Sequence, residues 1–243
     1  MKHLFLFMVM LVVFAVSVTA QNQRVSVADG TDLNVVLSDS RFQFDGFKES
    51  RVLFKNSTAT SALMNFNLLT GAMMFIDEKG DTLVLSNISD ILAISIDNHL
   101  FKYESKKILE VIALDKETEI ELLVKRSIQF DAYKYGAYGM AAPTSSIDNV
   151  TTLAISPARF GLSTQHEYLG VNKEVRFQRK DVYYLTQGKK NRVADKKGFL
   201  KVFSKHSNAV KSYIEKEKIK FNKEQDILRL YKYCVNIQAQ SKQ

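Results

Sequence analysis

Cysteine, tryptophan and proline are almost absent from this sequence. Its 243 residues include one cysteine, no tryptophan and two prolines. A single cysteine forms no disulfide within the chain, which excludes the disulfide-stapled scaffolds of small secreted proteins. Without tryptophan, the chain also lacks the side chain that many carbohydrate sites use for stacking. With 46 % hydrophobic and 25 % charged residues, the composition is that of an ordinary globular protein with its own core.

Histidine is also scarce, and the common catalytic motifs are missing. The histidines after residue 20 are His99, His166 and His206, and none has a second histidine at the spacing of a zinc site. No glycine-rich phosphate loop and no G-x-S-x-G elbow occurs. We therefore assign no catalytic, cofactor-binding or metal-binding residues and expect no cofactor.

Two local groups of reactive side chains have simpler explanations. The segment 163–167, STQHE, places a serine three residues before a histidine, but polar neighbours in a glycine-flanked loop explain it better than a nucleophile–base pair. Asp77, Glu78 and Asp81 crowd one turn without the ligand spacing of a calcium loop. We interpret them as an acidic hairpin tip.

The first 20 residues predict an export signal. An almost unbroken apolar run extends from Leu4 to Val18, and small residues precede the bond between Ala20 and Gln21. The run is shorter than the ~20 residues with which a helix spans a bilayer. We expect signal peptidase to cleave between Ala20 and Gln21, and we expect no transmembrane segment in the remaining chain. The protein would then be exported from the cytosol.

Between Arg51 and Arg126, apolar side chains recur at every second residue, which is typical of β-strands with one face in solvent. The clearest apolar sets are Met64, Phe66 and Leu68, which alternate with Asn65 and Asn67; Leu92, Ile94 and Ile96; and Ile120, Leu122 and Val124. Hairpin-length connections at 70–71 and 77–81 each contain a glycine that can take a positive φ. This spacing predicts an antiparallel meander, a sandwich or a partly closed barrel.

The alternation stops between residues 131 and 172. Both prolines and four of the ten glycines fall in this segment, which we expect to be irregular. Within it, Tyr133, Tyr135 and Tyr138 stand among glycines. They form either a binding loop, because tyrosine supplies contact area at low entropic cost, or slack chain between two parts of the fold. We favour slack chain. Alternation returns at 174–185, which predicts one or two strands that rejoin the sheet.

Helices are predicted after residue 189. Asp195 is placed to cap a short helix that carries Phe199 on its apolar side. Val210 and Ile214 share one face of a second helix.

A third helix is predicted near the end of the chain. Asn222 and Gln225 have the spacing of a capping box, and Cys234 lies on the apolar stripe that follows. On that stripe we expect Cys234 to be a small buried hydrophobe rather than a reactive thiol or an intermolecular bridge.

The positive charge is concentrated in this helical region. Residues 189–232 contain 14 Lys or Arg and 5 Asp or Glu, while the whole chain carries a formal charge of +8. This region is either a surface for an anionic partner or simply a solvated helix exterior. We favour the solvated exterior, because its lysines fall at angles all round the helices. Nucleic acid is not an expected partner of an exported protein that has no recognition motif.

Three segments carry a resemblance to a known group. They are NFNLLTGAMMFIDEKGDTLVLSN (65–87), YGAYGMAAPTSSID (135–148) and FLKVFSKHSNAVKSYIEKEKIKFNKEQDILRLYKYC (199–234). Together with the export signal, the chain resembles exported, signal-peptide-bearing proteins of Bacteroidetes, a group with no assigned activity. The resemblance implies a Gram-negative envelope, and hence a location in the periplasm, at the outer membrane or outside the cell. It brings no catalytic residues to this chain.

We thus expect an α+β fold, in which a mainly antiparallel β part (a meander, a sandwich or a partly closed barrel) is followed by two or three C-terminal helices. The expected divisions are a signal peptide at 1–20, a β domain at 21–188 with its irregular segment at 131–172, and a basic helical region at 189–243. The expected function is a non-enzymatic binding or scaffold role in the cell envelope, with an envelope protein, a glycan or an anionic lipid surface as partner. The alternatives are a hydrolase acting on envelope or scavenged polymer, and peripheral binding to anionic membranes through the basic helices.

Overall fold

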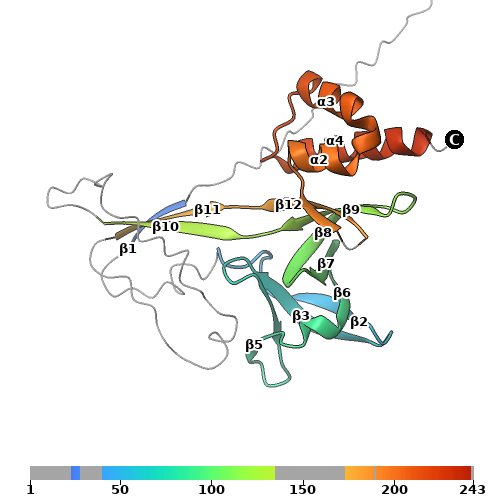
Figure 1. Cartoon of the computed structure of the whole chain (residues 1–243). Coiled ribbons are helices and arrows are strands. Elements are labelled where there is room, and N and C mark those ends of the chain that lie inside the picture. The colour runs from blue at the N-terminus through green and yellow to red at the C-terminus, as the bar shows by residue number, and fades with distance from the viewer. Residues whose placement is uncertain (1–22, 28–39, 135–172, 189, 242–243) are drawn as a thin grey trace, which may run out of the picture.

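The computed structural model describes residues 23–27, 40–134, 173–188 and 190–241; for 23–27, 130–134 and 173–177 it describes the backbone only. Ten strands form one antiparallel sheet in the order β13-β12-β9-β8-β7-β6-β2-β3-β4-β5, and β1, β11 and β10 form a second, three-stranded sheet. Helices α2, α3 and α4 follow at the C-terminal end (Figure 1). The predicted α+β class is confirmed, and the large sheet is not closed.

The elements have the following bounds. The large sheet contains β2 (Lys48–Phe54), β3 (Ala59–Asn67), β4 (Ala72–Ile76), β5 (Thr82–Val84), β6 (Ile91–Ile96), β7 (His99–Glu104), β8 (Lys107–Asp115), β9 (Ile120–Lys125), β12 (Val182–Gln187) and β13 (Lys190–Val193). The small sheet contains β1 (Gln23–Val27), β10 (Ile128–Lys134) and β11 (Lys173–Arg179). The helices are α2 (Lys196–Val202), α3 (Ser207–Lys216) and α4 (Glu224–Gln240), with 3-10 turns η1 (Ile88–Asp90) and η4 (Ser204–His206).

The large sheet curls around one of its faces. Phe66 on β3 and Phe101 on β7 stack with their ring centroids 5.7 Å apart, although β2 and β6 separate these strands in the sheet. Because strands of a flat sheet are spaced about 4.8 Å apart, this contact requires strong coiling. The enclosed side chains form the curled-sheet core, made of Val52, Met64, Phe66, Leu68, Met73, Ile91, Ile94, Ile96 and Phe101.

A second core joins the helices to the other end of the large sheet. Figure 1 shows α2, α3 and α4 stacked over β9 and β12, while β2 to β5 lie at the opposite end. Ile227, Leu230 and Cys234 of α4 are fully buried there against Leu122 and Leu185. We call this the helix core. The predicted apolar stripe of the third helix and the burial of Cys234 are both confirmed.

The predicted N-terminal cap forms at α2 but not at α4. The Asp195 carboxylate accepts a hydrogen bond from Gly198 N at 2.6 Å, so the predicted cap is confirmed. At α4 the capping box is wrong, since the helix begins at Glu224 after Lys223, which makes no side-chain cap. The carboxylate of Asp226 instead accepts a hydrogen bond from Lys220 N, in the turn that precedes the helix.

The predicted hairpins are confirmed, but three side chains lie on an unexpected side. Gly71 and Gly80 adopt φ of +68° and +88° in the turns after β3 and β4. Asn65 and Asn67 are buried, not in solvent, since main-chain groups nearby take up their amides. Leu92 is 51 % exposed because the register between β2 and β6 shifts beside it.

The returning strands at 174–185 separate into two sheets. β12 pairs with β9 in the large sheet, whereas β11 pairs with β10 and β1 in the small one. The expectation that this stretch rejoins the main sheet therefore holds only for β12. β10 runs to Lys134, into the segment expected to be irregular, and β13 opens the C-terminal region as a strand.

Candidate functional site

Arg126, at the junction of β9 and β10, gathers three carboxylates. Its Nε lies 2.6 Å from Oε2 of Glu110, and its Nη1 lies 2.8 Å from Oδ2 of Asp181 and 2.6 Å from Oε2 of Glu224. Arg126 is 11 % exposed and Glu110 only 4 %. We call these four residues the arginine cluster.

The arginine cluster stands between the two hydrophobic cores. On β8, Glu110 pairs with Phe101 of the curled-sheet core on one side and with Val124 of the helix core on the other. A buried carboxylate needs a charged or hydrogen-bonded partner at such a position, and Arg126 supplies it. Asp181 extends the contact to the start of β12 and Glu224 to the start of α4.

The contacts within the cluster shift the pKa values of Glu110 and Arg126. Burial alone raises the pKa of Glu110, but the hydrogen bonds and charges of Arg126 and His99 outweigh it and hold that pKa below its usual value. Burial alone likewise lowers the pKa of Arg126, and the three carboxylates reverse this effect and raise it. Tyr183, whose hydroxyl donates to Glu224 at 3.2 Å, has a raised pKa because of burial and the Glu224 charge. Glu110, Arg126 and Tyr183 are therefore held in their ordinary charge states at neutral pH.

The histidine beside the arginine cluster reaches solvent. His99 Nδ1 lies 2.5 Å from Oε1 of Glu110, its side chain is 41 % exposed, and Phe44 packs edge-on against its ring. A histidine held by a buried carboxylate is also the arrangement of a general base. Within the described residues, however, no hydroxyl or thiol is hydrogen-bonded to His99, so the pair lacks a nucleophile. We interpret the arginine cluster as a structural junction.

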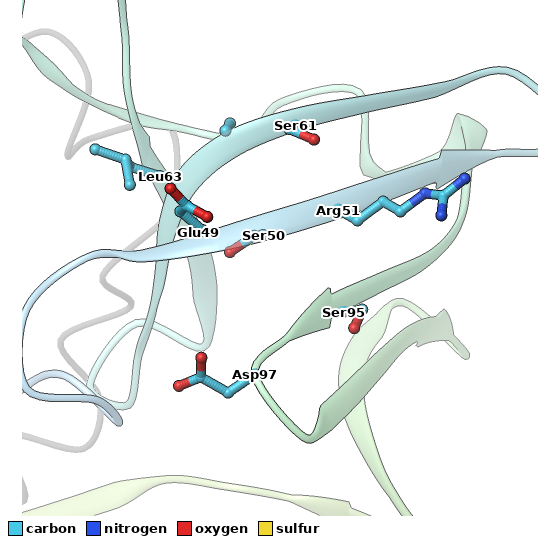
Figure 2. A pocket seen from close by; sticks show the side chains of 8 residues that line it. Glu49, Ser50, Arg51, Ser61, Leu63, Ser95 and Asp97 are labelled. Carbon is cyan, nitrogen blue, oxygen red and sulfur yellow. The ribbon is translucent and has the colours of Figure 1, made fainter.

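An open depression of about 660 Å³ lies on the outward face of β2, β3 and β6 (Figure 2). The strand register places Arg51 between Ser61 of β3 and Ser95 of β6 on this face. Its neighbours along β2, Ser50 and Val52, are buried. Most of its lining side chains are exposed; these are Glu49, Arg51, Ser61, Leu63, Ser95 and Asp97.

The charges in the depression are separated. In Figure 2 the carboxylates of Glu49 and Asp97 lie toward one end, and the guanidinium of Arg51 extends away from them toward the other. The serine hydroxyls of Ser61 and Ser95 lie between, and Leu63 is 43 % exposed at the carboxylate end. This surface offers acceptors, donors and one apolar contact without enclosing a ligand.

Neither the arginine cluster nor the depression contains a residue that was predicted from the sequence as a site candidate. Tyr133 is the penultimate residue of β10, where its backbone is paired with Glu174. Tyr135, Tyr138 and the expected cleavage site at Ala20 and Gln21 lie outside the described residues, as does the segment 163–167. The choice between binding loop and slack chain thus stays a prediction.

The acidic turn at 77–81 lies within the described residues, and the carboxylate of Asp77 binds main-chain N–H groups of the same turn. Asp77 Oδ1 accepts hydrogen bonds from Lys79 N at 2.9 Å and Asp81 N at 2.8 Å. This supports the interpretation as a hairpin tip. Across the described part of the chain, no group of three or more His, Cys, Asp or Glu side chains is placed to hold a metal ion.

No protein-family model, no curated protein and no solved structure matches this chain. Among the helices of the described ranges, none is both long and apolar enough to cross a membrane.

Proposed function

We propose that this is an exported, non-enzymatic protein of a bacterial cell envelope that binds another envelope component through the outward face of β2, β3 and β6. The observation that supports the proposal is the open depression on that face. It combines exposed carboxylates, a guanidinium and hydroxyls on a rigid sheet. The amino-terminal pattern of an export signal supports the location.

The exposure of these groups favours binding over catalysis. Catalytic carboxylates act where a water-poor enclosure tunes them and holds a substrate at hydrogen-bonding distance. Glu49 and Asp97 are exposed instead, and Arg51 points away from both. The buried carboxylate Glu110 has both oxygens engaged, one by His99 and the other by Arg126 and Gln43.

Site-specific photocrosslinking tests the proposal. A benzoylphenylalanine at Leu63 should give one reproducible adduct with an envelope component in living cells. The same probe at Lys116, an exposed turn residue between β8 and β9, should not give that adduct. Replacing Arg51 by alanine and Asp97 by asparagine, which also tolerates the φ of +48° at this position, should abolish the adduct from Leu63 while leaving the melting temperature unchanged, since both side chains are exposed.

Two results would reject this function. The first is the absence of any adduct that depends on Arg51 and Asp97. The second is polymer hydrolysis by the purified protein that is lost on His99→Ala substitution, since that outcome would make the His99–Glu110 pair catalytic.

A further inference from the structure

The C-terminal helices present lysine to solvent on a large scale. Every lysine from Lys190 to Lys232 that the structure describes is exposed. Those on the helices and their connections are Lys196, Lys197, Lys201, Lys205, Lys211, Lys216, Lys218, Lys220, Lys223 and Lys232. We call this set the lysine layer.

The acidic residues of the same region do not neutralise the lysine layer. All five, Asp195, Glu215, Glu217, Glu224 and Asp226, are already engaged. Asp195 caps α2, Glu224 binds Arg126, and Glu217 and Asp226 bind Arg229. Only Glu215 pairs with a member of the layer, Lys196, at 3.5 Å.

The fold directs this charge away from the sheet. The apolar sides of α2, α3 and α4 are buried against β9 and β12, so the lysines occupy the remaining sides of the helices (Figure 1). The lysines are spread around each helix, but they therefore gather on the sides of the helices that face away from the sheet. The layer therefore covers the helical end of the protein.

We propose that the lysine layer docks on an anionic lipid bilayer. This inference deepens the proposed envelope function and rests on it for location, but it concerns a different surface from the depression. A Lys ammonium is a flexible point charge, whereas Arg provides the planar fork that recognises individual phosphates or carboxylates. The arginine of these helices, Arg229, is committed to Glu217 and Asp226.

A bilayer fits this surface better than a polysaccharide or a protein groove. Saccharide sites use exposed aromatic faces, but Tyr213 and Tyr233 stack on each other with centroids 3.9 Å apart and so cover one face of each ring. A broad set of exposed point charges matches a surface of diffuse negative charge. Each basic residue near such a surface raises binding about fivefold.

Vesicle co-sedimentation with the purified chain tests this docking. The protein should bind vesicles that contain one-third phosphatidylglycerol in phosphatidylcholine, and it should not bind pure phosphatidylcholine. Binding should be lost between about 0.1 M and about 1 M NaCl, over which the Debye length falls from about 10 Å to about 3 Å. The triple variant K201Q/K211Q/K216Q should bind roughly a hundredfold more weakly.

The matched control removes the same charge from the sheet. Lys55, Lys79 and Lys106 are equally exposed in turns of the large sheet, and K55Q/K79Q/K106Q should bind like the parent protein. Equal weakening of both triple variants would overturn the proposal, because net charge alone would then be responsible. Absence of vesicle binding at about 0.1 M NaCl would also overturn it, with or without retention on an acidic polysaccharide such as alginate. Neither result bears on the crosslink from Leu63, so this inference and the proposed function can fail separately.

Discussion

Asp181 and Glu224 share one guanidinium nitrogen. They lie 2.8 and 2.6 Å from Nη1 of Arg126, one immediately before β12 and the other at the first residue of α4. Since Nε of the same side chain holds Glu110 on β8, a single residue fixes the helices and the returning strand to the middle of the large sheet. The stability of the fold should therefore depend on this residue more than on any surface charge.

Replacement of Arg126 by methionine should lower the free energy of unfolding by about 3–5 kcal/mol, because Glu110 would remain buried without its countercharge. Equilibrium unfolding in urea measures the change. The double variant R126M/E110M should recover part of this loss, since an apolar pair leaves no buried charge. The control is Arg229→Met, at a side chain 46 % exposed, which should cost less than about 1 kcal/mol. Equal effects of the two single variants would contradict the structural role assigned to the arginine cluster.

Glu110 should make the protein sensitive to acid. Its folded-state pKa is below its usual value, so its contribution to stability is present above the unfolded pKa of about 4.3 and is lost as the pH falls through the folded pKa. Urea unfolding of the parent protein should thus show a free energy of unfolding that declines over this acid window. Glu110→Gln should flatten the decline, whereas Glu215→Gln, at a side chain 71 % exposed, should not. Parallel curves for the parent and Glu110→Gln would be the contrary result.

Asn65 should contribute clearly to the stability of the fold although it carries no charge. Its side chain accepts from Phe44 N at 3.2 Å and donates to Phe44 O at 2.9 Å and Gly46 O at 2.6 Å, and the side chain itself is fully buried. Asn65→Ala would leave main-chain groups unpaired at a cost of at least about 2 kcal/mol. In a chain of this size that corresponds to a drop of roughly 4–8 °C in melting temperature. Asn236→Ala, at an exposed position of α4, serves as the control and should melt within about 1 °C of the parent.

Cys234 should be inert in the folded protein. Burial raises the pKa of its thiol to about 12, and only the thiolate reacts rapidly with disulfide reagents. At about pH 8 the thiol should react with Ellman's reagent at least 100-fold more slowly in buffer than in concentrated urea. A cysteine placed at the exposed Ser212, in a Cys234→Ala background, should react at once without urea. Fast labelling of the native chain would restore the reactive-thiol interpretation.

The parts of the fold that could be predicted are those set by local patterns. Alternation along the chain predicted the strands between 51 and 126, and the apolar stripe predicted that Cys234 lies on the buried side of α4. Leu92 lies on the exposed face of β6, against the prediction, because a register shift between β2 and β6 is a property of two segments. Asn65 and Asn67 are buried, against the prediction, because main-chain groups outside β3 bind their side chains, at Phe44 and in the turn after β3, and the alternation does not show such partners.

The arginine cluster could not have been found from spacing. Its four members come from β8, from two connections between strands and from the start of a helix. The one local signal was Glu110 itself, an acidic residue inside the apolar run ILEVIAL at 108–114. The depression was equally hidden, since Arg51, Ser61 and Ser95 look like ordinary solvent-facing strand residues until the register brings them together.

The route of the chain through the large sheet implies an order of assembly. β2 to β9 occupy a continuous stretch of chain, whereas β12 reaches β9 only after the whole excursion through β10 and β11. The buried side of α4 packs in one core with residues of β9 and β12. The Tyr231 hydroxyl of α4 also donates a hydrogen bond to Ile120 O of β9 at 2.6 Å. Because distant segments pay loop-closure entropy before they gain contacts, we expect this docking to be a late step of folding. A polypeptide that emerges N-terminus first would then expose one side of β9 until α4 packs against it, and exposed apolar surface of this kind promotes aggregation.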